Sequence, residues 1–349
     1  MREQGADVRF FARRSDVDAA GIVAAAGFDL RSVASTSQAR SSSDSAPTVA
    51  HSSWLDTSPE QDAADTIAAL GDWCPDRVVV DHYAIAAPWH RALREATGAA
   101  LVAVDDLADR PLAVDLVLDH NPARDHREKY RTALGPGGAG STSLLGGPSY
   151  ALIDAAYRQQ PPRAFHDRVQ SIGIFMGGTD PGNHSLWALQ ACRRNAVWQG
   201  PVQLATTSSN RHLDRLRDEA QRDRALELLI DQPNLAAFHA SHDLQIGAGG
   251  GALWERCALG VPTLALVCAA NQMLSVPLLA EQGVVAGFDA LEQSPASQAE
   301  LGATISDLIT SATDRAALRE RSLACVDGRG AERAAAAMLA LRPVPRRYP

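Results

Sequence analysis

The segment 246–256 combines residue types that suit the binding of a nucleotide. Its sequence, IGAGGGALWER, joins an apolar run to a row of glycines and then to a helical pattern that carries Glu255 in its first turns. Glycines at such a junction let backbone N–H groups approach an anion closely, and a helix N-terminus favours negative charge. The segment therefore predicts a phosphate on the backbone and ribose hydroxyls on Glu255. A tight turn whose glycines serve only packing is the alternative.

Two further junctions in the second half of the chain carry residues that suit a polar ligand. Gly178 follows the apolar run 172–176 and permits close approach of a ligand, whereas Asp180 either contacts that ligand or caps the next helix. Asn271 and Gln272 follow another apolar run, and their amides can serve sugar hydroxyls, N-acyl groups or a diphosphate oxygen. Helix capping is the alternative role of Asn271.

Polar residues follow apolar runs in the first half of the chain as well. Asp81, His82 and Tyr83 come directly after the run 78–80, and His120 follows a later run. Residues in such loops are candidates for substrate contact or proton transfer, with a purely structural role as the alternative.

The adjacent carboxylates Asp105 and Asp106 bring a divalent metal into consideration. Neighbouring residues on an extended chain point to opposite sides, so the pair makes a poor chelate. Salt bridges or helix caps are predicted for both residues, and no metal site is predicted.

Apolar runs that alternate with helical patterns must position these residues. Such runs are typical of parallel sheets covered on both faces. We therefore predict an α/β fold of two doubly wound, Rossmann-like domains, with the ligand in a cleft outside the carboxyl ends of the strands. The domains are expected at 1–156 and 169–349, with a linker at 157–168. The predicted strands are 8–11, 78–80, 101–104, 116–118, 172–176, 202–205, 226–230, 244–246 and 263–267.

The composition argues against several classes of protein. The 349 residues carry a formal net charge of −8, which disfavours a nucleic-acid or anionic-membrane surface. The five cysteines form no CxxC pair, so neither a zinc site nor a disulfide framework is predicted. No apolar run approaches the ~20 residues of a membrane span, and the N-terminus is unlike a signal peptide. The sequence predicts a cytoplasmic monomer that binds no nucleic acid and no membrane.

A set of segments, colinear over nearly the whole chain, resembles a known family. This family is the UDP-2,4-diacetamido-2,4,6-trideoxy-β-L-altropyranose hydrolases of pseudaminic (nonulosonic) acid biosynthesis, which are similar in architecture to GT-B glycosyltransferases. The matching segments are WLDTSPEQDA (54–63), VVVDHYAI (78–85), VAVDDLADR (102–110), DLVLDHN (115–121), LLGGPSYALI (144–153), FMGGTDPGN (175–183), IGAGGGALWERCALGVP (246–262) and AANQ (269–272).

The resemblance implies a reaction in which water replaces UDP at the anomeric carbon of a UDP-linked 2,4-diacetamido-2,4,6-trideoxyhexose. It implies no cofactor, and it places UDP on the C-terminal domain. The diphosphate and ribose are then assigned to the backbone of Gly250, Gly251 and Ala252 and to the side chain of Glu255.

The resemblance also assigns residues to the other parts of the substrate. The uracil is expected beside Asn234 and Leu235. Catalytic roles near the reacting sugar are implied for Tyr83 and Asn271. The remaining expected sugar contacts are Gly178, Asp180 and Gln272.

The chain departs from this family at its start. The family begins with a strand and a Gly-x-Gly-His loop whose histidine activates water, whereas this chain begins with a polar segment before the run 8–11. We therefore expect an N-terminally truncated member with an incomplete first domain, weak or normal UDP binding and slow hydrolysis. His82 and His120 are candidates to replace that histidine. The alternatives are a GT-B glycosyltransferase and a non-catalytic UDP-sugar-binding remnant.

Overall fold

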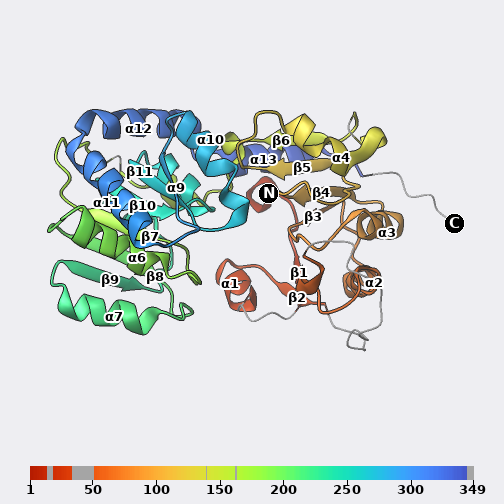
Figure 1. The fold of residues 1–349 in the computed structure, drawn as a ribbon. Coiled ribbons are helices and arrows are strands. Elements are labelled where there is room, and N and C mark those ends of the chain that lie inside the picture. Colours follow the sequence, from red (N-terminus) through yellow and green to blue (C-terminus); the bar gives the residue numbers. More distant parts are fainter. Residues whose placement is uncertain (14–18, 34–50, 139, 162, 344–349) are drawn as a thin grey trace. The chain divides into compact units, whose positions relative to one another are not determined.

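The chain forms two compact units, which we describe from a computed structural model (Figure 1). The model describes residues 1–13, 19–33, 51–138, 140–161 and 163–343. The first unit comprises residues 1–120, 124–146 and 332–349, and the second comprises 121–123 and 147–331. The predicted boundary at residue 156 falls inside the second unit, and the chain returns to the first unit at its end.

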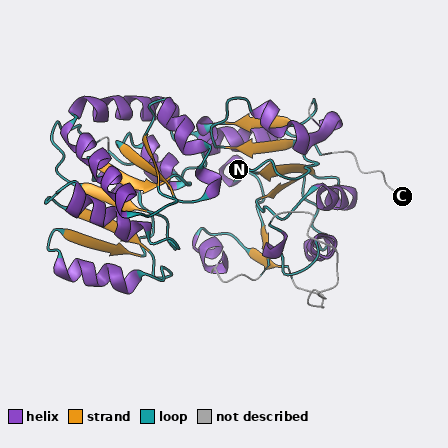
Figure 2. Ribbon diagram, in the orientation of Figure 1, coloured by secondary structure: helices purple, strands orange, loops and turns teal. Residues whose placement is uncertain are grey.

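The second unit is built on a six-stranded parallel sheet with the order β12-β11-β10-β7-β8-β9. Figure 2 shows these strands in orange among purple helices. The strands are β7 (Ile172–Phe175), β8 (Val202–Thr206), β9 (Leu226–Ile230), β10 (Leu244–Ala248), β11 (Thr263–Val267) and β12 (Ala286–Asp289). The α-helices of this unit are α5 (Ala155–Arg158), α6 (His184–Gln190), α7 (Leu213–Arg222), α8 (Ala236–Ala240), α9 (Ala252–Ala258), α10 (Ser275–Glu281), α11 (Pro295–Thr310) and α12 (Ala312–Cys325).

The first unit contains a four-stranded parallel sheet of order β3-β4-β5-β6 and a separate parallel pair, β1-β2. The strands are β1 (Phe10–Ala12), β2 (Leu30–Ser32), β3 (Arg77–Val80), β4 (Ala100–Val104), β5 (Leu116–Asp119) and β6 (Ser143–Gly146). The α-helices are α1 (Ala19–Ala25), α2 (Pro59–Leu70), α3 (Ala87–Thr97), α4 (His126–Gly138) and α13 (Gly330–Ala340), the last of which begins in the second unit. The predicted parallel α/β architecture is confirmed.

Burial on both faces explains why the central strands read as continuous apolar runs. In β11, Leu264 and Leu266 pack into one core cluster, whereas Ala265 and Val267 pack into another. Successive side chains of a strand point to opposite faces, so these two clusters lie on opposite sides of the sheet. Among the described residues, no helix is both long and apolar enough to span a membrane.

Every predicted strand is present, with its ends moved by a few residues, but β2, β6 and β12 were not predicted. Each of these three is the outer strand of its sheet, and their sequences, LRS, SLLG and AGFD, lack a continuous apolar run. An edge strand pairs on one side only and is partly exposed. Its sequence therefore need not contain the continuous apolar run that identifies a buried strand.

Candidate functional site

The glycine turn 249–251 joins the carboxyl end of β10 to α9, and its glycines serve two different purposes. A Cβ atom at Gly249 would collide with Val276, and one at Gly247, within β10, would collide with the guanidinium of Arg256. These two glycines are needed for packing. At Gly251, by contrast, a Cβ would meet no atom within 4 Å. The packing alternative therefore accounts for Gly247 and Gly249, but not for Gly251.

The first turn of α9 leaves backbone donors for a ligand. No side chain caps this helix, and its first hydrogen bonds run from Leu253 N to Gly250 O (2.9 Å) and from Trp254 N to Gly251 O (3.1 Å). The earliest N–H groups of a helix have no partner within it. The amides of Gly250, Gly251 and Ala252 occupy this position.

Gln272 brings a side-chain donor to the same turn. Its Oε1 accepts a hydrogen bond from the amide of Cys268 (2.8 Å), which fixes the orientation of the side chain. Its Nε2 lies 3.7 Å from the position that a Cβ on Gly250 would take. An amide nitrogen can only donate, so this group suits an anionic oxygen. Of the roles considered for Gln272, contact with a diphosphate oxygen fits this geometry best.

Glu255 lies on α9 with 28% of its side chain exposed, and it contacts two aromatic residues of other elements. Tyr157, on α5, lies near its carboxylate. Nε2 of His239, on α8, lies 3.5 Å from its Oε2. Burial alone would raise the pKa of Glu255, but its contacts with His239 and Tyr157 and the charge of Arg256 hold the pKa below its usual value. The carboxylate is therefore ionised and able to accept hydroxyl groups.

Arg256 stabilises the end of β10, directly before the glycine turn. It is fully buried, and its Nη2 donates to the carbonyl of Ala248, the last residue of β10 (2.7 Å). Its Nε and Nη1 have no hydrogen-bond partner among the described residues. Burial lowers the pKa of this guanidinium to about 10, so Arg256 is still charged at neutral pH. It adds a positive charge close to the glycine turn.

Asn234 and Leu235, the residues expected beside a uracil, precede α8. Asn234 is exposed, and its Oδ1 accepts a hydrogen bond from the amide of Ala236 (3.0 Å). The backbone of Leu235 lies near Tyr157, as does Glu255.

Asp180 takes the capping role that the sequence left open. The residue is 2% exposed, and its two carboxylate oxygens accept the amides of His184 and Ser185 at the start of α6 (2.9 Å each). Gly178 lies in the same loop, where its carbonyl accepts a hydrogen bond from Thr207 (2.9 Å). Asp180 shapes the loop, and its carboxylate is not available to a sugar.

Asn271 caps no helix. It is exposed within the short 3-10 helix Ala270–Gln272, and the N-cap residues of this helix and of α10 are Ala269 and Leu274. The capping alternative for Asn271 is therefore wrong, and its amide faces solvent.

In the first unit, Tyr83 lies in a group of aromatic side chains after β3. Its hydroxyl donates to Oδ1 of Asp106 (2.5 Å), and burial together with this contact raises its pKa. The ring lies 5.4 Å from that of His51 and 5.8 Å from that of Trp54, centroid to centroid. Trp54 is 59% exposed, so the group presents an aromatic face to solvent.

Of the two histidines predicted as candidates for proton transfer, His82 and His120, the first already uses its acceptor nitrogen for a contact within the protein. Burial lowers the pKa of His82 and that of His120, so both rings are neutral at pH 7. The amide of Ala84 donates to Nδ1 of His82 (3.2 Å), which leaves the proton of the neutral ring on Nε2. Asp81, beside them, has a pKa raised by burial.

Asp105 forms the salt bridge that was predicted for it. Arg110 donates to its Oδ1 (2.6 Å), and the hydroxyl of Tyr130 donates to its Oδ2 (3.0 Å). A second buried carboxylate, Asp119, pairs with Lys129 (2.6 Å). Among the described residues, no group of three His, Cys, Asp or Glu side chains is arranged to hold a metal ion.

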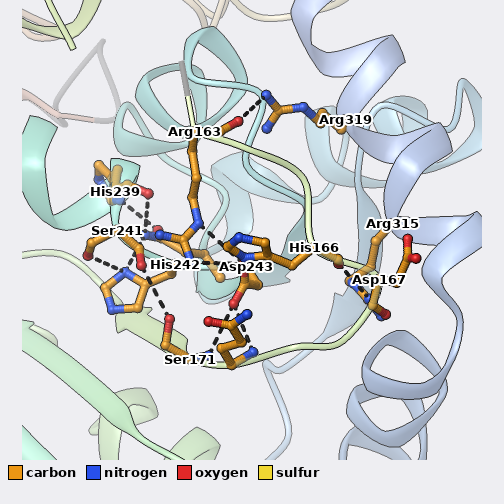
Figure 3. Close-up of polar contacts among 12 residues, drawn as sticks. Arg163, His166, Asp167, Ser171, His239, Ser241, His242, Asp243, Arg315 and Arg319 are labelled. Carbon is orange, nitrogen blue, oxygen red and sulfur yellow. Dashed lines mark hydrogen bonds and ion pairs between the residues drawn. The ribbon is translucent and has the colours of Figure 1, made fainter. Parts of the chain in front are cut away.

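The segment that follows Tyr157 is fastened at the amino ends of the strands of the second unit (Figure 3). Asp243, directly before β10, has 3% of its side chain exposed. Several donors converge on its carboxylate: Arg163 Nη2 at 2.9 Å, His166 Nδ1 at 2.8 Å, Gln170 N at 2.8 Å and Ser171 N at 3.3 Å. We call this group the Asp243 cluster.

Two arginines of α12 hold the same segment by its backbone. Arg315 donates to the carbonyl of Asp167 (2.6 Å), and Arg319 donates to the carbonyl of Arg163 (2.8 Å), as drawn in Figure 3. The predicted linker 157–168, of which residue 162 lies outside the described residues, is thus attached to the second unit rather than free.

These two parallel-sheet units define an α/β protein with a fold of the GT-B type. MurG of Acinetobacter baumannii has a TM-score of 0.60 at 12% identity, with 97% of this chain and 93% of that chain covered. The glycosyltransferase SnogD of Streptomyces nogalater has a TM-score of 0.53 at 16% identity over 97% and 92%. The UDP-GlcNAc 2-epimerase of Neisseria meningitidis, bound to UDP-GlcNAc, has a TM-score of 0.55 at 12% identity over 82% and 83%.

Sequence comparison finds relatives consistent with the resemblance. The chain is 26% identical over 206 residues to the UDP-2,4-diacetamido-2,4,6-trideoxy-beta-L-altropyranose hydrolase of Campylobacter jejuni, which covers 59% of this chain and 71% of the relative. It is 23% identical over 193 residues to the spore coat polysaccharide biosynthesis protein SpsG of Bacillus subtilis, which covers 55% and 56%. No protein-family model matches the sequence.

The sequence prediction includes neither Tyr157, His239 nor Arg256 among the site residues. No local pattern marks the first two, because their contacts with Glu255 come from elements distant in sequence. Arg256 directly follows Glu255, but only the fold shows that it is buried. In the first unit, Trp54 was identifiable as the start of the matching segment WLDTSPEQDA.

Proposed function

We propose that this protein is an enzyme that hydrolyses a UDP-linked 2,4-diacetamido-2,4,6-trideoxyhexose at its anomeric carbon. The observation that carries the proposal is the open glycine turn with the ionised Glu255 behind it, at the carboxyl end of a central parallel strand. Ligands of open α/β sheets bind at this edge. Support for the hydrolase, and for the diacetamido sugar, comes from the relative in Campylobacter jejuni.

In this proposal, the second unit binds UDP. The amides of Gly250, Gly251 and Ala252 accept the diphosphate, and Gln272 Nε2 donates to one of its oxygens. Arg256, buried beneath the turn, contributes positive charge. Glu255 accepts the ribose hydroxyls, while the uracil lies beside Asn234 and Leu235. These contacts stabilise the negative charge that UDP gains as it leaves.

The first unit then supplies groups for the sugar and for water. A neutral histidine, His120, takes a proton from water as its oxygen bonds to the anomeric carbon and the bond to UDP breaks. Tyr83 and the exposed amide of Asn271 are assigned to the sugar. Asp180 acts through the loop that contains Gly178 rather than by direct contact.

The decisive experiment measures UDP release from the diacetamido UDP-sugar in water enriched in ¹⁸O, with no acceptor present. Hydrolysis at the anomeric carbon gives free UDP and places ¹⁸O in the sugar. UDP release only after an acceptor is added would make the protein a glycosyltransferase. Tight UDP binding without turnover would make it a non-catalytic binding protein. UDP-GlcNAc is the control for selectivity towards the diacetamido sugar.

Tyr83→Phe tests the proposed role of the first unit. Removal of this hydroxyl should lower kcat about tenfold to a hundredfold, in the range expected for a group that assists proton transfer. The affinity for UDP should not change, because UDP is assigned to the second unit. Stopped assays with the diacetamido UDP-sugar and calorimetry with UDP measure the two quantities. An unchanged kcat would remove Tyr83 from the mechanism.

A further inference from the structure

The hydroxyl of Tyr83, in the loop after β3, uses its single hydrogen for a contact within the protein. It donates to Oδ1 of Asp106 at 2.5 Å. Burial and this hydrogen bond raise the pKa of Tyr83, so the hydroxyl keeps its hydrogen at physiological pH. A phenolic hydroxyl has one hydrogen to donate and lone pairs that accept. Towards a ligand, the oxygen of Tyr83 is therefore an acceptor only.

The loop that carries Asp106 is held by two neighbouring side chains of α4. Lys129 donates through Nζ to the backbone carbonyl of Asp106 (2.7 Å). Tyr130 donates to the backbone carbonyl of Asp105 (2.8 Å). The carboxylate that accepts the Tyr83 hydroxyl thus lies on a fixed backbone. Groups held in this way have their direction set before a ligand binds.

Aromatic rings surround this acceptor. The rings of His51 and Trp54 lie 5.4 Å and 5.8 Å from the ring of Tyr83, and 4.9 Å from each other, centroid to centroid. Trp54 is 59% exposed, an unusually large exposure for a side chain that already has ring partners on one side. We call these three residues the aromatic platform. It offers flat apolar surface directly beside an oxygen that accepts a hydrogen bond.

A secondary amide of the N-acetyl type matches both features. Its N–H donates to an oxygen that only accepts, and its methyl group and flat amide suit an aromatic face. A phosphate or carboxylate brings no donor and would meet the carboxylate of Asp106. A cation is disfavoured as well, because the guanidinium of Arg110 already lies 5.7 Å from the centroid of the Tyr83 ring. A sugar hydroxyl can donate but has no flat apolar part.

We propose that the aromatic platform, His51, Trp54 and Tyr83, is a subsite for an N-acetyl group of the sugar, and that Asp106 is the positioning residue that keeps the Tyr83 hydroxyl an acceptor. This inference rests on the proposed function and names the part of the substrate that the first unit recognises. The selection acts on one atom: an amide N–H is accepted, whereas an ester oxygen in its place meets the lone pairs of Tyr83.

The test uses two UDP-sugar analogues in which a methylene group replaces the anomeric oxygen, so that neither is hydrolysed. One carries both acetamido groups. The other carries acetate esters in their place, which keeps the methyl and carbonyl groups and removes only the N–H. We expect the wild type to bind the acetamido analogue about tenfold more tightly in calorimetry.

Variants of Asp106 test the positioning role. Asp106→Ala should reduce the preference for the amide to about twofold, because the freed hydroxyl of Tyr83 can then donate to the ester. Asp106→Asn should keep the preference, since its amide oxygen accepts the same hydrogen bond. Tyr83→Phe removes the acceptor itself and should abolish the preference, which provides a second test if Asp106→Ala does not fold. Thermal unfolding checks that each variant is folded.

Trp54→Ala tests the aromatic surface separately. Both analogues carry the methyl groups, so this change should weaken both by about fivefold and leave the preference for the amide as it is. Trp54→Phe keeps an aromatic ring and should retain most of the affinity. UDP itself should bind all these variants as it binds the wild type, because it is assigned to the second unit.

The outcomes separate this inference from the proposed function. If the wild type does not bind UDP, the proposed function is wrong. If it binds UDP and binds the two analogues equally, only the N-acetyl subsite is overturned. A preference that survives Asp106→Ala would remove the positioning role, and unchanged affinities in Trp54→Ala would remove the aromatic platform.

Discussion

The two ends of β10 differ in how their polar groups are satisfied. At the amino end, the carboxylate of Asp243 is enclosed by two side chains and two backbone amides. At the carboxyl end, Gly251 faces open space, and Arg256 keeps two nitrogen atoms without partners in the described part of the chain. Buried polar groups in folded proteins are normally paired, and exceptions need an explanation. We infer that one end serves stability and the other serves a ligand.

Gly251→Val should cause the largest loss of UDP affinity among variants at the two ends of β10. The valine side chain would fill the space beside the turn, so we expect UDP affinity to fall by at least about 3 kcal/mol, roughly a hundredfold in Kd. The fold should tolerate the change, because the Gly251 backbone is already helical, at φ −51° and ψ −40°, and no atom blocks a Cβ. Calorimetry with UDP and thermal unfolding measure the two effects.

Gly249→Ala is the control for this variant. Its Cβ would collide with Val276, so it should destabilise the fold by about 1–3 kcal/mol. If Gly251→Val retained normal UDP affinity, the whole turn would serve only packing.

Asp243→Ala, at the amino end of β10, should lower stability and leave UDP affinity almost unchanged. It leaves Arg163 and the amides of Gln170 and Ser171 without their acceptor, which should lower the free energy of unfolding by about 3 kcal/mol. UDP affinity of the folded fraction should stay within twofold or so of the wild type. Urea unfolding and calorimetry test this pair of expectations. A large loss of UDP affinity with unchanged stability would contradict the division of labour along β10.

Glu255→Ala should weaken UDP binding by about 1.5–3 kcal/mol, the contribution of hydrogen bonds to a charged group. Its stability should change less than that of Asp243→Ala, because 28% of the Glu255 side chain is exposed. Glu227→Ala, on β9, is the control for loss of a carboxylate from the same unit, since Glu227 accepts a hydrogen bond from Gln203 away from the glycine turn. Unchanged UDP affinity in Glu255→Ala would refute the ribose role.

Acid should lower the stability of the protein through His242, with a smaller effect. This buried histidine directly precedes Asp243, and its Nδ1 lies 2.7 Å from the carbonyl of Phe238. Burial lowers the pKa of this histidine to about 4, below its unfolded value. As pH falls from 7 to 5.5, the unfolded state binds a proton that the folded state does not, so stability decreases by about 1 kcal/mol from this group. His242→Gln should remove that part of the pH dependence in urea unfolding, without altering UDP affinity. An identical pH profile in the variant would show that His242 does not titrate between the two states.

The sequence alone predicted the central parallel strands and the position of the glycine turn. The central strands are buried on both faces, so they appear as apolar runs whose ends can be predicted to within a few residues. The turn 249–251 and Glu255 are neighbours along the chain, so the sequence alone could suggest their proposed role in nucleotide binding. The edge strands β2, β6 and β12 escaped prediction because partial exposure leaves them no such signal.

Only the tertiary structure decided which polar residues act on one another. It made Asp180 a helix cap, left Asn271 exposed and outside any cap position, and placed Tyr157, from a segment that reads as a linker, near Glu255. These outcomes depend on contacts between elements that are separated by many residues, whereas composition and periodicity report on local structure only. Local pattern therefore locates the glycine turn, and only the fold shows which residues surround it.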